Sequence, residues 1–157
     1  MNTINQEIKL TNNKVALIDK EDYDKVSKLK WYCSNNDGKL YAVNKNKKVL
    51  YMHRLIMSAP AGYEVDHING DGLDNRKVNL RLCSSSQNKY NQKLSSANTS
   101  GFKGVTWNKN KGKWQVQIGS RNKYKYLGLF EDKYDAAKAY NKEAVRLFGD
   151  FARVNII

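Results

Sequence analysis

The spacing of apolar and polar residues in the first third of the chain predicts short strands and one helix. Residues 7–18 form two apolar runs around an Asn12-Asn13 turn, which is the pattern of a hairpin. Apolar residues then recur three apart between 20 and 29, which predicts a helix with Asp19 as its N-cap. Residues 31–52 alternate between short apolar runs and polar turns, which predicts a meander of strands.

The middle of the chain predicts two strands and a helix in close succession. A short helix is expected to begin at His53, followed by a strand over 65–68, a Gly-rich turn and a further element from 77. Ser84 and Gln87 have the spacing of a capping box, which predicts the start of a helix. The order strand, turn, strand, helix is a ββα unit.

The last third of the chain has a different pattern. Residues 93–100 are small and polar without periodicity, which is typical of a linker. Three strand-like runs, at 102–107, 113–118 and 124–130, predict an antiparallel sheet. Asp132 can cap a final helix whose apolar stripe packs on that sheet; its members are Ala136, Ala137, Tyr140, Ala144 and Leu147.

These patterns predict an α+β protein of two modules. The length of 157 residues allows one domain or two small ones, and a hydrophobic content of 40% is enough to bury a core. We expect a ββα module within residues 1–92, a linker over 93–100, and a three-stranded sheet packed on one helix over 101–157.

Positive charge is spread over the whole chain. The net charge is +13: residues 1–98 carry 16 basic and 10 acidic side chains, a surplus of 6, and residues 99–157 carry 12 and 5, a surplus of 7. A distributed positive field with interleaved Tyr and Trp favours a polyanion, nucleic acid first. A solvated Lys-rich surface explains the charge as well, so the choice between it and nucleic-acid binding depends on the sequence motifs.

The cysteines and the apolar segments exclude several classes of protein. Cys33 and Cys83 lack C-x-x-C partners, which argues against a zinc finger or a disulfide scaffold, and we expect both to be reduced core residues. No signal peptide and no membrane-length apolar run is present. We therefore expect a cytoplasmic protein without a membrane or an obligatory protein partner.

Asp66-His67, placed before the Gly-rich turn, is the strongest candidate for chemistry. Phosphodiester hydrolysis needs a base for the attacking water and positive charge near the phosphate. Asp66 and Asn88 offer oxygen ligands that suit one Mg²⁺ or Mn²⁺ ion, and His67 can be the base. Neighbours on a strand point to opposite faces, so a bend, a bulge or a helix folded over the strand end is required. Asn79 can hold the turn closed, which is a structural role.

Residues 66–70 (Asp-His-Ile-Asn-Gly), 79–81 (Asn-Leu-Arg) and 87–88 (Gln-Asn) closely resemble the HNH homing endonucleases of phages and bacteria, which are ββα-metal (His-Me finger) nucleases. The resemblance implies that His67 is the general base, Asn79 the central structural asparagine, and Asp66 and Asn88 the ligands of a divalent metal. Asn88 stands where other members have the last histidine, which matches a variant subset and leaves strand nicking open as the outcome.

His53 also belongs to this resemblance, because a Met-His-Arg-Leu run precedes the motif in these families by a similar distance. His53 either contacts the scissile phosphate or braces the active-site helix. A packed histidine at a helix start explains it equally well.

Residues 101–155 resemble the APETALA-type (ethylene-response-factor) DNA-binding domains. The resemblance implies a sheet laid in the major groove of double-stranded DNA with a helix behind it. Alternation predicts Val116, Ile118 and Leu127 on the helix side. The residues expected at DNA are Lys103, Thr106, Trp107, Lys109, Lys111, Lys113, Gln117, Arg121, Tyr124 and Tyr126. Several arginines of the plant proteins are replaced here, so the plant target sequence does not carry over, and Trp107 and Trp114 fit a core position as well as a contact.

Together these observations predict a metal-dependent DNA endonuclease of the homing HNH type, acting in the bacterial or phage-infected cell and targeted by its C-terminal module. The alternative is a DNA-binding regulator whose nuclease module no longer cleaves.

Overall fold

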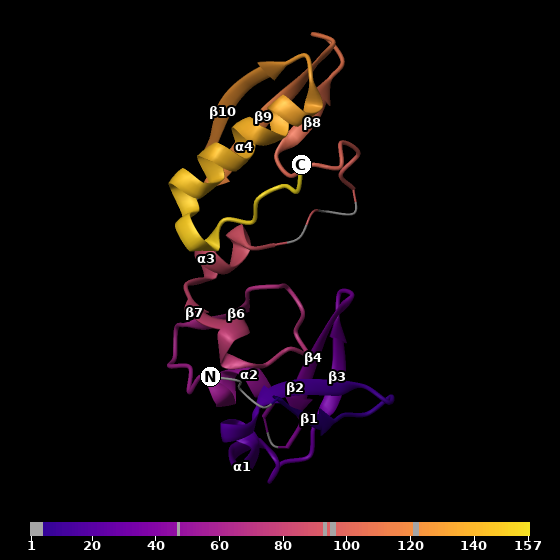
Figure 1. The fold of residues 1–157 in the computed structure, drawn as a ribbon, viewed down its shortest axis with the longest axis vertical. Coiled ribbons are helices and arrows are strands. Elements are labelled where there is room, and N and C mark those ends of the chain that lie inside the picture. Colours follow the sequence, from indigo (N-terminus) through magenta and orange to yellow (C-terminus); the bar gives the residue numbers. More distant parts are fainter. Residues whose placement is uncertain (1–4, 47, 93, 95–96, 121–122) are drawn as a thin grey trace. The chain divides into compact units, whose positions relative to one another are not determined.

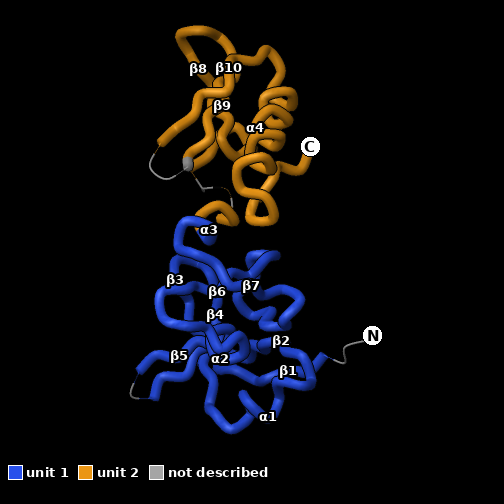
Figure 2. Tube along the Cα trace, turned by 90° about the vertical axis from the view of Figure 1, so that its left-hand side faces the viewer, with its two compact units in different colours: residues 1–88 blue, residues 89–157 orange. Residues whose placement is uncertain are grey.

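The chain is a mixed α/β protein with small sheets and few helices. The structure is a computed structural model that describes residues 5–46, 48–92, 94, 97–120 and 123–157. It divides into two compact units, Met1–Asn88 and Lys89–Ile157 (Figure 2). This division falls four residues before the expected end of the first domain at residue 92. The expected boundaries remain a prediction, and residues 93, 95 and 96 of the expected linker lie outside the described residues.

The first unit contains short antiparallel sheets and short helices (Figure 1). A hairpin pairs β1 with β2, a meander has the order β3-β4-β5, and a third pair joins β6 to β7. The bounds are β1 Asn5–Lys9, β2 Val15–Asp19, η1 Lys20–Asp22, α1 Tyr23–Val26, β3 Tyr32–Asn36, β4 Lys39–Asn44, β5 Leu50–Tyr51, α2 Met52–Ile56, β6 Glu64–His67, η2 Lys77–Asn79, β7 Leu80–Cys83 and α3 Ser85–Tyr90, the last of which begins in this unit.

The predicted N-terminal hairpin is confirmed, and the predicted helix after it is much shorter than expected. Asn12 and Asn13 take positive φ values of 60° and 54°, a conformation that asparagine adopts more readily than most residues. Only η1 and the four residues of α1 are helical, because the Trp31 indole donates to the carbonyl of Val26 at 2.8 Å where the helix ends. Asp19 does not cap this helix; its carboxylate accepts the backbone N–H of Lys77 at 2.8 Å.

The core of the first unit brings the strands and α2 together. The buried members are Ile8, Leu10, Ala16, Ile18, Val26, Trp31, Ala42, Met52, Ile56, Val65 and Leu80. Strand β2 also holds the loop that joins β6 to β7: Leu17 N–H donates to Leu73 O, and Asn75 N–H donates to Leu17 O, both at 2.8 Å. The loop that carries the motif is therefore fixed by a strand residue 56 to 58 positions earlier in the sequence (73 minus 17 and 75 minus 17).

The second unit is the predicted three-stranded antiparallel sheet with a helix packed on one face (Figure 1). The sheet order is β10-β9-β8, and the core contains Phe102, Val105, Val116, Ile118 and the buried stripe of the helix. The bounds are β8 Val105–Asn108, β9 Lys113–Ser120, β10 Lys123–Phe130, α4 Lys133–Phe148 and η3 Gly149–Phe151.

Most of the predicted features of helix α4 are confirmed. Asp132 caps it by accepting the N–H groups of Tyr134 and Asp135, and Ala136, Ala137, Tyr140 and Ala144 are buried. Leu147 is 37% exposed, so its place on the buried stripe is wrong; it lies in the last turn of the helix. Gly104 has a φ of 75°, and an added Cβ would overlap the Tyr140 ring, so only glycine allows this close approach.

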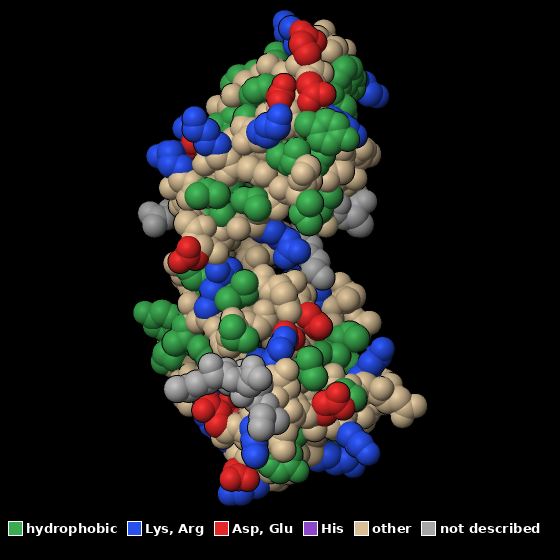
Figure 3. Space-filling view, viewed as in Figure 1, with side chains coloured by type: hydrophobic (Ala, Val, Ile, Leu, Met, Phe, Trp, Pro, Cys, Tyr) green, Lys and Arg blue, Asp and Glu red, His purple; other side chains and the backbone are tan. Residues whose placement is uncertain are grey.

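The described surface carries basic side chains on both units, as Figure 3 shows for one face. Cys33 and Cys83 are free thiols; Cys83 is buried as expected, whereas Cys33 is only half-buried against the core. Among the described residues, no helix has the length and apolar character that a membrane crossing requires.

Candidate active site

The loop between β6 and β7 is closed by the side chain of Asn79. Its Oδ1 accepts the N–H of Asn69 at 3.0 Å, and its Nδ2 donates to the carbonyl of Asp74 at 2.8 Å. The backbone adds a bond from Ile68 N–H to Asn79 O at 2.9 Å. One buried amide thus cross-links both ends of the turn, which are the contacts that a structural asparagine needs.

His67 is buried in a group of rings. It is 6% exposed, its ring centroid lies 4.8 Å from that of His53 and 6.0 Å from that of Tyr41, and its Nε2 lies 3.4 Å from Oδ1 of Asn75. Burial lowers the pKa of His67, while the Asn75 hydrogen bond and the charge of Asp66 act in the opposite direction. The imidazole is therefore neutral near pH 7 and can accept a proton.

Asp66 faces a guanidinium. Its carboxylate is 5% exposed, and its Oδ2 accepts Nε and Nη2 of Arg81 at 2.9 and 2.7 Å across the β6–β7 pair. The negative charge on this side of the sheet also reaches Cys83: burial, together with Asp66 and Glu64, raises the pKa of that thiol to about 11. A carboxylate is the kind of hard oxygen ligand that a divalent ion takes, and here the Arg81 guanidinium competes with a metal ion for it.

Asn88 reaches the same strand from helix α3. The predicted capping box is confirmed, because Ser84 N–H donates to Gln87 Oε1 at 2.8 Å and Gln87 N–H donates to Ser84 Oγ at 3.2 Å. With the helix start fixed, Asn88 Nδ2 donates to Glu64 Oε2 at 2.6 Å. Glu64 and Asp66 are two residues apart on β6, so they share a face. This bond is made by the amide nitrogen of Asn88.

Asp66 and His67 lie on opposite sides of strand β6, as the sequence alternation predicts. The register of β6 with β7 has no shift, so Asp66 and His67 point to different sides of the strand. The side chain that lies near both is Tyr41: its ring is tilted against His67, and its pKa is raised by burial, by Tyr51 and by Asp66. Helix α3 brings Asn88 to the Glu64 side, but nothing in the strand itself places Asp66 and His67 together.

A groove of about 380 Å³ opens beside these residues. Its lining is Asn36, Tyr41, Tyr51, His53, Arg54, Glu64, Val65 and Asn88. His53 is 7% exposed, and its Nδ1 has no hydrogen-bond partner among the described residues. Burial, together with the neighbouring His67 and Arg54, lowers the pKa of His53 to about 3, so the groove receives a neutral imidazole.

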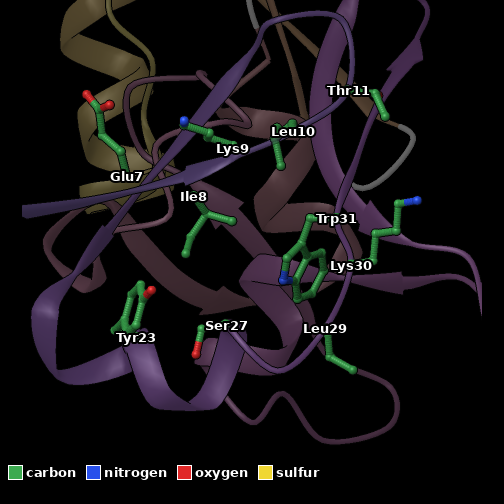
Figure 4. Close-up of a pocket in the computed structure, with 10 residues that line it drawn as sticks. All are labelled: Glu7, Ile8, Lys9, Leu10, Thr11, Tyr23, Ser27, Leu29, Lys30 and Trp31. Atoms are coloured by element: carbon green, nitrogen blue, oxygen red, sulfur yellow. The ribbon is translucent and has the colours of Figure 1, made fainter.

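A second cavity, of about 510 Å³, lies between β1, α1 and the segment that ends at Trp31 (Figure 4). Ile8 and Trp31 supply its apolar floor, and Glu7, Lys9 and Lys30 its charged rim. None of the predicted site residues lines it. Of the predicted nuclease residues, Asn88 and His53 line the first groove, whereas Asp66, His67 and Asn79 do not.

The sheet of the second unit presents only part of the predicted DNA contacts on its open face. Tyr124 pairs with Gly119 and Tyr126 with Gln117, and the two tyrosines are 81% and 56% exposed on the face away from α4. Thr106 joins them by alternation, and Lys113 on this face forms an ion pair with Glu131. Lys109 and Lys111 are exposed in the turn between β8 and β9. Val116, Ile118 and Leu127 face the helix as predicted, Leu127 through a bulge in β10.

Two predicted contacts lie elsewhere, and a third is not described. Trp107 pairs with Trp114, and both lie on the face of the sheet that bears Val116 and packs on the helix. Their two indole rings meet edge to face, with centroids 5.0 Å apart. Lys103 Nζ donates to the carbonyls of Tyr90 and Gln92 at 2.7 and 3.0 Å, so its ammonium is engaged inside the unit. Arg121 lies outside the described residues.

Sequence reasoning gave no role to Glu64, Asn75 or Arg81. Glu64 had a usable signal, since it stands two residues before Asp66 on a predicted strand and alternation places both carboxylates on one face. Arg81 also had one, because it is part of the matched motif. Asn75 had none, because its position depends on the contact with β2.

Comparison with known proteins assigns the segment that carries this site to a known family. The family model for the HNH endonuclease matches residues 51–90, which span α2, β6, β7 and α3. The chain is 32% identical over 148 residues to an uncharacterized HNH endonuclease of Acanthamoeba polyphaga mimivirus, covering 90% of this chain and 75% of that protein. The chain belongs to the HNH endonuclease family, and it is an enzyme, a phosphodiester hydrolase whose nuclease domain implies a DNA substrate.

Further similarities are partial. Protein 3.8 of Escherichia phage T7 is 39% identical over 64 residues, which cover 41% of this chain and 53% of that protein. APETALA2-like protein 2 of Oryza sativa subsp. indica is 42% identical over 59 residues, covering 36% of this chain and 13% of the plant protein. No solved structure matches the chain.

Proposed function

We propose that the chain cleaves double-stranded DNA with one divalent metal ion, Mg²⁺ or Mn²⁺, bound by Asp66 and Asn88, and with His67 as general base. One observation carries the proposal: the capping box of α3 sets Asn88 against β6, where its amide donates to Glu64 at 2.6 Å on the face that Asp66 shares. The expected ligand pair, 22 residues apart in sequence (88 minus 66), is thereby joined to one strand.

The residues at this face fit a hard divalent ion. HNH nucleases typically use a divalent metal. Asp66 offers a carboxylate and Asn88 an amide oxygen, and Glu64 adds a second carboxylate beside them. The described residues hold no cluster of three or more His, Cys, Asp and Glu side chains, which favours an ion completed by water and phosphate oxygens over a closed protein cage. Such an ion supplies positive charge to the scissile phosphate and to the leaving oxygen.

The chain's own side chains divide the remaining tasks. His67 takes the proton of the attacking water, because burial keeps its imidazole neutral. Asn79 has a structural role, holding the turn that follows His67. His53 lies in the groove as a neutral side chain with an unpartnered Nδ1 among the described residues, which suits a hydrogen bond to the phosphate of the substrate. This groove is the proposed path of the cleaved strand.

Plasmid nicking tests the nuclease proposal. Supercoiled DNA incubated with the chain is expected to be nicked or cut in Mg²⁺ and to stay intact in EDTA. His67→Ala is expected to abolish cleavage, and Asn88→Ala to raise the metal concentration that cleavage requires. Val78→Ala is the matched control, because Val78 is 78% exposed in the same loop region. Cleavage retained in His67→Ala refutes the base assignment, and DNA binding without cleavage by the wild type supports the regulator.

We further propose that the second unit is an APETALA-type domain that positions the nuclease on DNA. The support is its sheet with one helix behind, its open face bearing Thr106, Gln117, Tyr124 and Tyr126, and the partial similarity to plant proteins of that name. The unit is cationic, with 12 basic and 5 acidic residues over 99–157. Lys109, Lys111 and Lys113 lie on or beside the open face and suit phosphate contacts.

Binding measurements on the full chain test this role. Tyr124→Ala and Tyr126→Ala are expected to weaken binding to duplex DNA several-fold, since both rings are exposed and free of core contacts. Tyr134→Ala is the matched control, because Tyr134 is a 47% exposed tyrosine on helix α4, on the other side of the sheet. The wild-type affinity should fall steeply with salt, because phosphate contacts release counterions. A flat salt response, or equal losses in all three variants, contradicts the open face as the DNA surface.

The homing-type assignment is a proposal that rests on the spacing of Asp66-His67, Asn79 and Asn88. Sequencing cut ends from a randomised DNA library tests it, because a homing nuclease selects a long target, whereas a non-specific nuclease leaves unrelated ends.

A further inference from the structure

Asn75 is a fully buried polar residue with a fixed position beside His67. Its exposure is 0%, and its backbone N–H donates to Leu17 O at 2.8 Å, which ties it to strand β2. The neighbouring residue, Asp74, bridges Leu17 as well, and the Leu17 N–H donates to Leu73 O at 2.8 Å. Three successive loop residues are therefore held by one strand, and the Asn75 side chain starts from a rigid backbone.

The hydrogen bonds of the Asn75 amide determine its orientation. Nδ2 lies 3.1 Å from the carbonyl oxygen of Leu73. A carbonyl only accepts, so the atom that faces it must be the amide nitrogen, which donates. The other amide atom, Oδ1, consequently faces His67, at 3.4 Å from Nε2.

An amide oxygen is an acceptor without a proton to give, so it selects the form of imidazole that donates from Nε2. A neutral imidazole carries one N–H, and a proton on Nε2 leaves the lone pair on Nδ1. We propose that Asn75 is a positioning residue that holds His67 as the Nε2–H tautomer and thereby makes Nδ1 the basic atom of the nuclease. The catalytic use of this atom rests on the proposed function; the tautomer itself does not.

The tautomer matters because a base needs its lone pair at the atom that meets the water. The Nδ1–H form would present a donor at that atom and could not accept the proton. The hydrogen-bond partners that fix the tautomer of a metal-binding histidine are typically worth about 10- to 100-fold in metal affinity or activity, and we expect a similar factor for a histidine that acts as base. Replacing Asn75 should lower kcat by about that factor and leave KM little changed, since Asn75 is buried and does not line the groove.

Long-range proton–nitrogen NMR on the metal-free, DNA-free full chain tests the inference directly. The chain has only two histidines, so the spectrum contains two imidazoles, and a His53→Gln variant assigns them. Spectra are recorded well above neutral pH, where an imidazole is ordinarily neutral. The expected pattern is a protonated Nε2 and an unprotonated Nδ1 in His67. A protonated Nδ1, or an equal mixture of the two forms, overturns the proposal.

Three variants separate the orienting role from general loop structure. Asn75→Leu keeps the size but removes the acceptor, and is expected to give a mixture of tautomers. Asn75→Asp keeps an acceptor oxygen and is expected to retain the Nε2–H form. Asn69→Ala is the matched control: it removes loop bonds to Asp71 and Asp74, and should leave the tautomer unchanged.

The outcomes are distinguishable from those of the nuclease proposal. An unchanged tautomer in Asn75→Leu, or a switch to Nδ1–H in Asn75→Asp, overturns the role of Asn75 whether or not the chain cleaves DNA. If Asn75→Leu does not fold, the wild-type and Asn75→Asp spectra still decide. A chain that shows the Nε2–H form but does not cleave DNA contradicts only the proposed function.

Discussion

Replacing Arg81 with methionine should expose how strongly the fold depends on a cation at Asp66. The side chains of Arg81 and Asp66 are 16% and 6% exposed, and two guanidinium nitrogens contact Oδ2 at 2.9 and 2.7 Å. Removing one partner of a buried ion pair costs about 3–5 kcal/mol, because the other charge stays desolvated. Since Arg81 keeps some contact with water, we expect a loss near the lower end, about 3 kcal/mol of unfolding free energy in EDTA.

The metal proposal predicts that this loss shrinks when a divalent ion is present. An ion at one hundred times its dissociation constant adds about 2.7 kcal/mol to the folded state. In Arg81→Met the ion also supplies the positive charge that Asp66 has lost, so the variant should gain more from Mg²⁺ than the wild type does. The difference between the two proteins is therefore expected to be smaller in Mg²⁺ than in EDTA.

Urea unfolding followed by tryptophan fluorescence measures the unfolding free energy of the first unit alone. The chain has three tryptophans, and Trp31 is the one in the first unit's core. A background with Trp107→Phe and Trp114→Phe leaves Trp31, which is 3% exposed, as the reporter. Arg76→Met is the matched control, because Arg76 holds Asp74 through bonds of 2.7 Å to both carboxylate oxygens, yet neither residue is a proposed ligand.

Two results would refute the reasoning separately. A loss below about 1 kcal/mol in EDTA is the size of a surface ion pair and would show that water screens the charges. Equal losses in EDTA and Mg²⁺ for Arg81→Met, as expected for Arg76→Met, would show that Asp66 does not hold the ion.

Three further predictions concern stability and dynamics. The pKa of His53 is about 3 in the fold against 6.5 for the free side chain, so the unfolded state binds its proton first. The free energy of unfolding should therefore fall as pH drops from 6.5 toward about 3. In urea titrations at several pH values, His53→Phe should make this dependence on pH weaker. An unchanged dependence would contradict the burial of a neutral His53. Gly104→Ala should lower the free energy of unfolding by at least about 2 kcal/mol, because the backbone is left-handed and the new Cβ overlaps the Tyr140 ring. Gly112→Ala should lower it by only about 1 kcal/mol in the same assay, because Gly112 has a φ of 61° but open space around it. Equal costs would show that the Tyr140 ring moves away freely. Asn79→Ala should destabilise the first unit by about 2 kcal/mol and speed hydrogen exchange at the Asn69 amide, which donates to it; slow exchange in the variant would show another acceptor there.

The local features of this fold follow from neighbouring residues, and the sequence predicts them well. The capping box at Ser84 and the N-cap at Asp132 form as expected, because a cap is made by side chains within three residues of the backbone they satisfy. The strands of the second unit show the expected alternation, since the period of two is a property of the extended chain. The spacing of the nuclease motif was likewise readable along the chain.

Features that depend on distant partners were the ones missed. The helix expected over 20–29 stops at Val26, because Trp31 and the core set its length, and Asp19 serves Lys77, 58 residues later, in place of a helix cap. Lys103 gives its ammonium to carbonyls of the same unit, where the motif comparison expected DNA. In each case a polar group found a partner in the folded chain that the local pattern had not specified, and for Asp19 that partner lies 58 residues away.

The sequence by itself therefore determined the family of the enzyme, its ββα order, its sheet with one helix, and Asp66, His67, Asn79 and Asn88 as candidates, since each rests on spacing along the chain. Only the tertiary structure decided what surrounds them: Arg81 against Asp66, Glu64 against Asn88, and Asn75 against His67. The physical reason is that burial and hydrogen-bond pairing depend on elements far apart in sequence, here β2 against the motif loop, which no local pattern specifies.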